Sequence, residues 1–161
     1  MVNWKPEGYH TLTPYITVND VGKAIDFYQT AFGAEEISRL PGSGGSGVMH
    51  AELKIGDSML LVGQSKSEEH HEGHEEGHHE SHMRSCLLHI YVEDVDKAFE
   101  RAKAAGGEVK REPKDTFWGD RMGLIKDPFG HFWSLATQKE ELTNEQIRER
   151  AEEFYAQKSK R

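Results

Sequence analysis

The sequence predicts an α+β fold made of two βαβββ modules, and three observations support this prediction. The segment ITVNDVGKA, which begins at Ile16, returns as IYVEDVDKA from Ile90. Each copy contains a β-rich stretch, an acidic turn and an amphipathic helical pattern that a glycine ends. Further β-rich stretches follow each helical pattern. We expect the modules, about residues 10–64 and 85–137, to form a cupped, mostly antiparallel sheet with the helices outside.

The first module predicts one helix between its first and second strands. Asn19 and Asp20 end the first strand and can cap the helix that follows. Apolar residues recur at helical spacing as far as Phe32, and Gly33 ends the pattern. The strands are β-rich or alternating stretches, at 12–18, 37–40, 48–55 and 58–62.

The second module repeats this order. Its helical pattern starts at Val95 and stops at Gly106 and Gly107. Asp127-Pro128-Phe129-Gly130 predicts a turn between the last two strands. The strands are again β-rich, at 87–92, 108–111, 121–126 and 131–137.

Residues 1–140 therefore form one domain of two modules, and a separate helix follows over 141–161. Thr143 and Gln146 have the spacing of a capping box, which marks the start of this helix. Apolar residues at helical spacing give the helix a stripe that we expect to pack on the domain or on a second subunit. These features and the aromatic first helix predict a homodimer.

Charge and cysteine content limit the partners. The formal net charge is -8, whereas nucleic acids and anionic membranes need clustered Lys and Arg. No apolar run is long enough to span a bilayer, and the N-terminus has no signal-peptide pattern. The single Cys86 excludes an internal disulfide and predicts a small buried residue in a cytoplasmic protein. A small molecule is the partner that we expect.

Residues 65–84 form a His- and Glu-rich insertion between the modules. Six of the ten histidines lie within EEHHEGHEEGHHESH, residues 68–82. His70, His74, His78 and His82 recur every four residues, and donors at this density bind divalent metals. Two interpretations remain open: a polar surface insertion that is dispensable for folding, or a segment that binds Zn²⁺, Ni²⁺ or Cu²⁺.

The repeat and several motifs resemble the vicinal oxygen chelate superfamily, which includes glyoxalase I, bleomycin-resistance proteins, fosfomycin-resistance enzymes and extradiol dioxygenases. The resemblance covers about residues 10–140, and the tail is similar to one glyoxalase-like branch. The motifs are DFY from Asp26, AFGA from Ala31, FWGDR from Phe117 and DPFGH from Asp127. The resemblance implies a ligand site in a cleft between the modules.

In the metal enzymes of this family, four ligands come from the first and last strands of each module. The resemblance carries these positions onto Thr13, Leu87, Glu52 and Ser134. Only Glu52 is an ordinary ligand of zinc, nickel, iron or manganese. A shifted set is a second hypothesis, in which alternation along the strands brings His50, Glu52 and His89 together as a facial triad.

The candidate catalytic residues are Glu52 and His50, as acid–base groups on one face of a strand. We expect the ligand to be bound by aromatic, hydroxyl and basic side chains, namely Thr13, Tyr15, His89, Trp118, Arg121, Phe132 and Ser134. Three functions remain open: a glyoxalase-like lyase or isomerase acting on a small polar molecule, a metal-free binding protein of the bleomycin-resistance type, and divalent-metal binding by the insertion.

Overall fold

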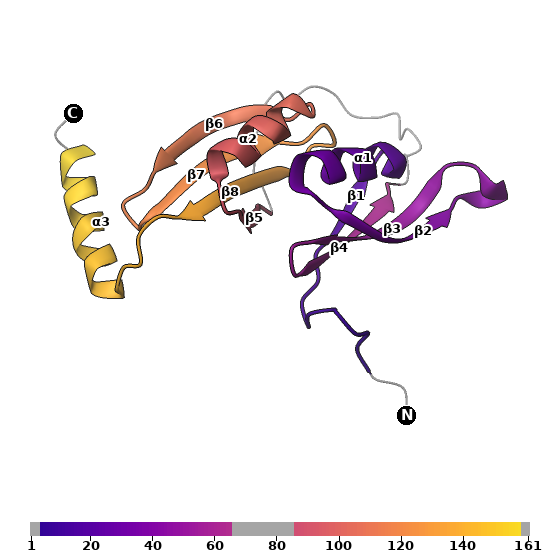
Figure 1. Cartoon of the computed structure of the whole chain (residues 1–161), viewed down its shortest axis with the longest axis horizontal. Coiled ribbons are helices and arrows are strands. Elements are labelled where there is room, and N and C mark those ends of the chain that lie inside the picture. Colours follow the sequence, from indigo (N-terminus) through magenta and orange to yellow (C-terminus); the bar gives the residue numbers. More distant parts are fainter. Residues whose placement is uncertain (1–3, 66–85, 159–161) are drawn as a thin grey trace, which may run out of the picture. The chain divides into compact units, whose positions relative to one another are not determined.

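The structure, a computed structural model, describes residues 4–65 and 86–158. The chain divides into two compact units, Met1–Met83 and Arg84–Arg161 (Figure 1). Each unit contains a four-stranded mixed sheet and a helix in the order βαβββ, and the second unit adds a C-terminal helix, so the predicted modules are confirmed. No helix in the described ranges is long and apolar enough to cross a membrane.

The first unit has the sheet order β1-β4-β3-β2. Its first and last strands pair in parallel, and the other neighbours pair antiparallel. A short 3₁₀ turn, Ser43–Gly45, interrupts the glycine-rich loop between β2 and β3. The elements are β1 (Tyr15–Val18), α1 (Val21–Phe32), β2 (Glu35–Pro41), β3 (Val48–Ile55) and β4 (Ser58–Gln64).

Helix α1 begins and ends where the sequence predicts. The carboxylate of Asp20 accepts a hydrogen bond from the Lys23 amide at 3.0 Å, which caps the first turn. Gly33 adopts a left-handed conformation, with φ of 69°, and its amide donates to the Gln29 carbonyl. The helix buries one face against β3 and β4, where Leu53 and Val62 are fully buried.

The second unit repeats the topology as β5-β8-β7-β6, again with its first and last strands parallel. The edge strand β6 runs four residues beyond the predicted end at Arg111, through Pro113. An edge strand tolerates proline because one side of its backbone needs no partner in the sheet. The elements are β5 (Leu88–Tyr91), α2 (Val95–Ala104), β6 (Glu108–Asp115), β7 (Asp120–Lys126) and β8 (Phe132–Gln138).

The turn between β7 and β8 is organised by Asp127, which is buried. One carboxylate oxygen accepts from the amides of Phe129 and His131, at 2.9 and 2.8 Å. The other accepts from the indole N–H of Trp133 at 2.9 Å. The predicted turn is thus confirmed, and the structure adds that it is tied to the largest buried side chain of the unit.

Helix α3 (Asn144–Lys158) is the predicted C-terminal helix, and its capping box is confirmed. The Gln146 side chain accepts from the Thr143 amide at 2.9 Å, and the Thr143 hydroxyl accepts from the Gln146 amide at 3.3 Å. One expectation is wrong: Cys86 is exposed, because it precedes β5 and lies outside the paired strands.

Candidate functional site

Each sheet has one face that packs against its helix and a second face, called here the open face. Alternation along β3 places Ala51 and Leu53 on the helix side, where both are fully buried. His50 and Glu52 therefore lie together on the open face of the first unit, as the sequence predicts. In the second unit, Trp133 and Leu135 are buried on the helix side in the same way.

Tyr15 and His50 form a ring pair on the open face of the first unit. Their centroids are 5.7 Å apart and their planes are tilted by 24°. Strand β4 lies between the two strands that carry them. A Cβ atom at Gly63 would come within 2.2 Å of the Tyr15 hydroxyl, so the tyrosine lies across this glycine. Sequence reasoning missed Gly63, although it is the residue that permits the pair.

The N-terminal segment reaches Glu52 through a tyrosine. The hydroxyl of Tyr9 hydrogen bonds to the Glu52 carboxylate; burial, this bond and the carboxylate charge raise the pKa of Tyr9. Glu52 is half-buried, so a base at this position is accessible from the open face. Thr13, a predicted ligand contact, donates instead to the His10 carbonyl at 3.1 Å.

His89 and Ser134 meet on the open face of the second unit. The two residues are paired across the parallel strands β5 and β8, and His89 Nδ1 lies 3.0 Å from Ser134 Oγ. Ser134 is buried, whereas His89 is exposed. Phe132 alternates onto the same face of β8, with the Lys126 ammonium 5.7 Å from its ring centroid. The predicted placement of these three residues on one face is therefore observed.

Asp120 joins two aromatic side chains at one carboxylate oxygen. The Tyr91 hydroxyl and the Trp118 indole N–H donate to Asp120 Oδ2, at 3.0 and 3.1 Å. Asp120 is 6% exposed, and the rings of Tyr91 and His89 contact each other edge to face at 4.8 Å. We call Tyr91, Trp118 and Asp120 the Asp120 cluster. Of these, the sequence singled out Trp118 alone.

The Asp120 cluster predicts a shifted titration of Tyr91. The pKa of Tyr91 is raised above 10.0, first by the hydrogen bond to Asp120, then by burial and by the carboxylate charge. Asp120→Asn should therefore return the pKa toward 10.0, as measured by carbon-13 NMR of the Tyr91 ring against pH. The native contact contributes stability below about pH 10 and loses it as pH rises through the raised pKa. An unchanged pKa of Tyr91 in the variant would contradict the hydrogen bond between Tyr91 and Asp120.

Arg121 does not share the open face with its neighbour Asp120. Its guanidinium makes a bidentate pair with Asp96 of α2, both distances being 2.8 Å, and contacts Asp115 at 3.2 Å. Successive residues of a strand point to opposite faces, and Arg121 takes the helix side. The sequence predicted that this guanidinium binds a ligand. In the structure it pairs instead with two carboxylates of its own unit.

The family's metal positions do not fit a metal in this chain. The resemblance placed Glu52 on the last strand of the first module, and this is wrong: Glu52 lies on β3, and the last strand is β4. In the first unit, Leu61 of β4 pairs with Tyr15 of β1. In the second unit, Ser134 of β8 pairs with His89 of β5 in the same way. Leu61 is therefore the residue of the first unit that corresponds to Ser134 and occupies the family's last-strand metal position. Two of the four positions are then leucines, which offer no donor atom.

The other metal hypotheses stay predictions. Within the described parts of the chain, no three His, Cys, Asp or Glu side chains are grouped closely enough to hold a metal ion. The facial triad combines His50 and Glu52 of the first unit with His89 of the second. His70, His74, His78 and His82 lie outside the described residues.

Comparison with known proteins identifies relatives of this arrangement. Residues 9–135 match the model of the Glyoxalase/Bleomycin resistance protein/Dioxygenase superfamily. The uncharacterized protein Mb0911c of Mycobacterium bovis is 36% identical over 136 residues, 84% of this chain and 88% of the relative.

Solved structures resemble the fold as well. TioX from Micromonospora sp. ML1 is 26% identical, with a TM-score of 0.59 over 79% of this chain and 98% of its own. The fosfomycin resistance protein FosX from Listeria monocytogenes is 23% identical, with a TM-score of 0.59 over 86% and 97%. The second similarity concerns the fold alone.

Proposed function

Since the chain belongs to the Glyoxalase/Bleomycin resistance protein/Dioxygenase superfamily, we propose that it binds a small polar organic molecule on the open face of the second unit. The observation that supports this most directly is the Asp120 cluster beside His89. Tyr91 and Trp118 offer aromatic surface for a planar ligand, and their polar ends are already held by one carboxylate. His89 Nδ1 contacts Ser134, and within the part of the chain that the structure describes no hydrogen bond engages the second ring nitrogen, which can therefore face a ligand.

The donor chemistry supports binding without the family's metal. The positions that hold a metal in the family carry Thr13, Leu61, Leu87 and Ser134 here, and Ser134 is engaged with His89. This set has no carboxylate or imidazole. We therefore favour the metal-free binding protein over the glyoxalase-like enzyme.

A ligand screen by thermal shift, run with and without a chelator, tests this function. A library of small planar polar molecules should contain compounds that raise the melting temperature by mass action, with the chelator making no difference. His89→Ala and Trp118→Ala should remove the rise. Arg121→Ala is the matched control and should keep it, because Arg121 pairs with Asp96 and Asp115. A rise that the chelator abolishes, or that both test variants retain, would overturn the proposal.

Glu52 supports a second candidate, a lyase or isomerase of the glyoxalase type. Its carboxylate lies on the open face beside His50 and accepts from Tyr9, so it could take a proton from a bound substrate. Glu52→Gln should then abolish turnover of any substrate found, while the variant still unfolds at the native temperature. Tyr9→Phe is the control that keeps the carboxylate. Full turnover in Glu52→Gln would exclude Glu52 as the base.

A homodimer and divalent-metal binding by residues 68–82 are two further proposals. Sedimentation of the purified chain would measure the first. Calorimetric titration of Zn²⁺ into the native chain and into one with residues 68–82 replaced by a Gly/Ser linker would measure the second.

A further inference from the structure

Helix α3 meets the rest of its unit at the turn between β6 and β7. Phe154 and Tyr155 of the helix contact the ring of Phe117 in this turn, with centroids 5.3 and 6.1 Å apart. Figure 1 shows α3 standing beside this end of β6 and β7. Two residues of the helix, Phe154 and Tyr155, therefore contact a specific loop of the domain and remain partly exposed.

The link between β8 and α3 contacts the same turn. The amides of Lys139 and Glu140 both donate to the Gly119 carbonyl, at 2.9 and 3.0 Å. Gly119 has a φ of 95°, and a Cβ atom there would lie 2.8 Å from the Glu140 carbonyl and 3.2 Å from the Leu142 side chain. The link is thus closely fitted to the turn.

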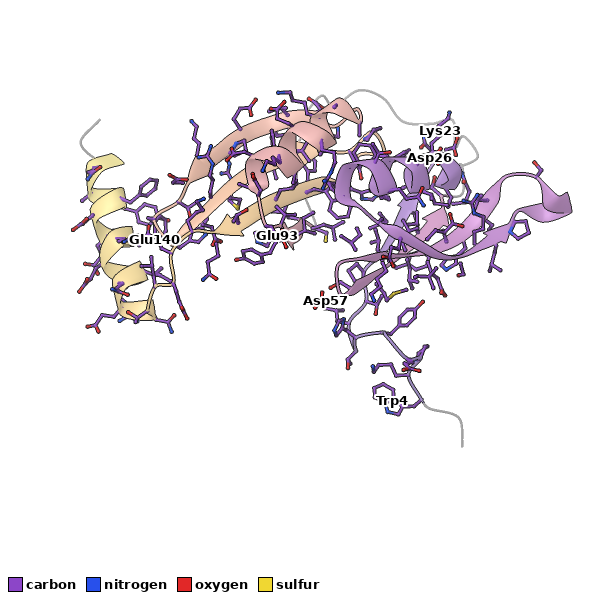
Figure 2. All side chains as sticks on the ribbon, viewed as in Figure 1. Trp4, Lys23, Asp26, Asp57, Glu93 and Glu140 are labelled. Carbon is purple, nitrogen blue, oxygen red and sulfur yellow. The ribbon has the colours of Figure 1, made fainter. Side chains whose placement is uncertain are left out.

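An ion pair fixes the helix to this link. Arg150 of α3 makes two contacts with the Glu140 carboxylate, at 3.0 and 2.8 Å. Glu140, labelled in Figure 2, lies between the sheet and the helix. This exposed ion pair links α3 directly to the segment that follows β8.

The same turn also connects Phe117 to the Asp120 cluster. Phe117 packs edge to face against Trp118, with centroids 4.8 Å apart, and the Trp118 indole N–H donates to Asp120. We propose that α3 holds Trp118 in place through Phe117, which makes Phe117, Phe154 and Tyr155 positioning residues for the Asp120 cluster. The importance of this positioning for ligand binding rests on the proposed function.

Hydrogen exchange of the indole N–H groups, followed by NMR in the full chain, tests the proposal without a ligand. The three tryptophans provide the readout and its references: Trp118 bonds to Asp120, Trp133 bonds to Asp127, and Trp4 is 83% exposed. The double change Phe154→Ala with Tyr155→Ala should speed exchange at Trp118 by about tenfold and leave Trp133 unchanged.

Two further variants separate positioning from general destabilisation. Tyr155→Phe keeps the ring and should exchange as the native protein does. Glu149→Ala changes an exposed residue of the same helix and should also leave Trp118 unchanged. Native exchange at Trp118 in the double variant, or equal acceleration at Trp118 and Trp133, would overturn the proposal. If exchange responds as expected and no ligand is found, the proposed function alone fails.

Discussion

Asp127→Ala is expected to lower the free energy of unfolding by about 3–5 kcal/mol. The change removes the acceptor of two turn amides and of the Trp133 indole N–H. Because Trp133 is 2% exposed, its N–H would remain buried without a partner. Urea unfolding followed by tryptophan fluorescence measures the loss.

The internal repeat supplies the control. Asp57 lies in the corresponding turn of the first unit, between β3 and β4, but it is exposed, and the Ser58 hydroxyl donates to its carboxylate at 3.0 Å. Asp57→Ala should change stability by less than about 0.5 kcal/mol. Equal effects of the two changes would show that the Asp127 contacts contribute nothing specific.

Gly123→Ala should cost about 1–3 kcal/mol, which is unusual for so small an addition. A Cβ atom at Gly123 would lie 2.6 and 2.8 Å from two ring atoms of Phe99 and 3.1 Å from Pro113. Phe99 is 1% exposed, so its ring cannot move aside without disturbing the core between α2 and the sheet. Thermal and urea unfolding of the variant would measure the cost.

A glycine-to-alanine substitution in the first unit should instead increase the stability of the protein. Gly22 lies in α1, and the nearest atom to its Cβ position is Asp20 Oδ1 at an ordinary 3.4 Å. Gly22→Ala should stabilise the protein by about 0.4–1 kcal/mol, because alanine loses less freedom in a helix. A neutral or stabilising Gly123→Ala would mean that the core beside Phe99 has room to relax.

Local patterns in the sequence were sufficient to predict the modules. The caps at Asp20 and Gly33, the turn at Asp127 and the capping box at Thr143 depend on neighbouring residues, and the structure confirms all of them. The end of β6 was missed because proline normally stops a strand, and only its position at the sheet edge permits Pro113.

For the candidate site, alternation along single strands predicted which side chains share a face, but not which strands lie side by side. It placed His50 with Glu52, and His89 with Ser134, on shared faces. The Asp120 cluster needs the order β5-β8-β7, which brings Tyr91 to Asp120 across β8 at Ala136. No local pattern contains that order. Glu52 was assigned to the last strand through the family resemblance, although local alternation already placed it in the preceding strand, 48–55.

The parallel pairing of first and last strands also sets an order of assembly during synthesis. In each unit the first strand leaves the ribosome early and must wait for the last strand before it has a neighbour. Once Gln64 has emerged, every strand of the first sheet is outside the ribosome, while β5 has yet to emerge. The first unit can therefore complete its hydrogen-bonded sheet co-translationally, ahead of the second. A ribosome stalled while β5 is still inside the exit tunnel would carry a nascent chain with all four of those strands exposed.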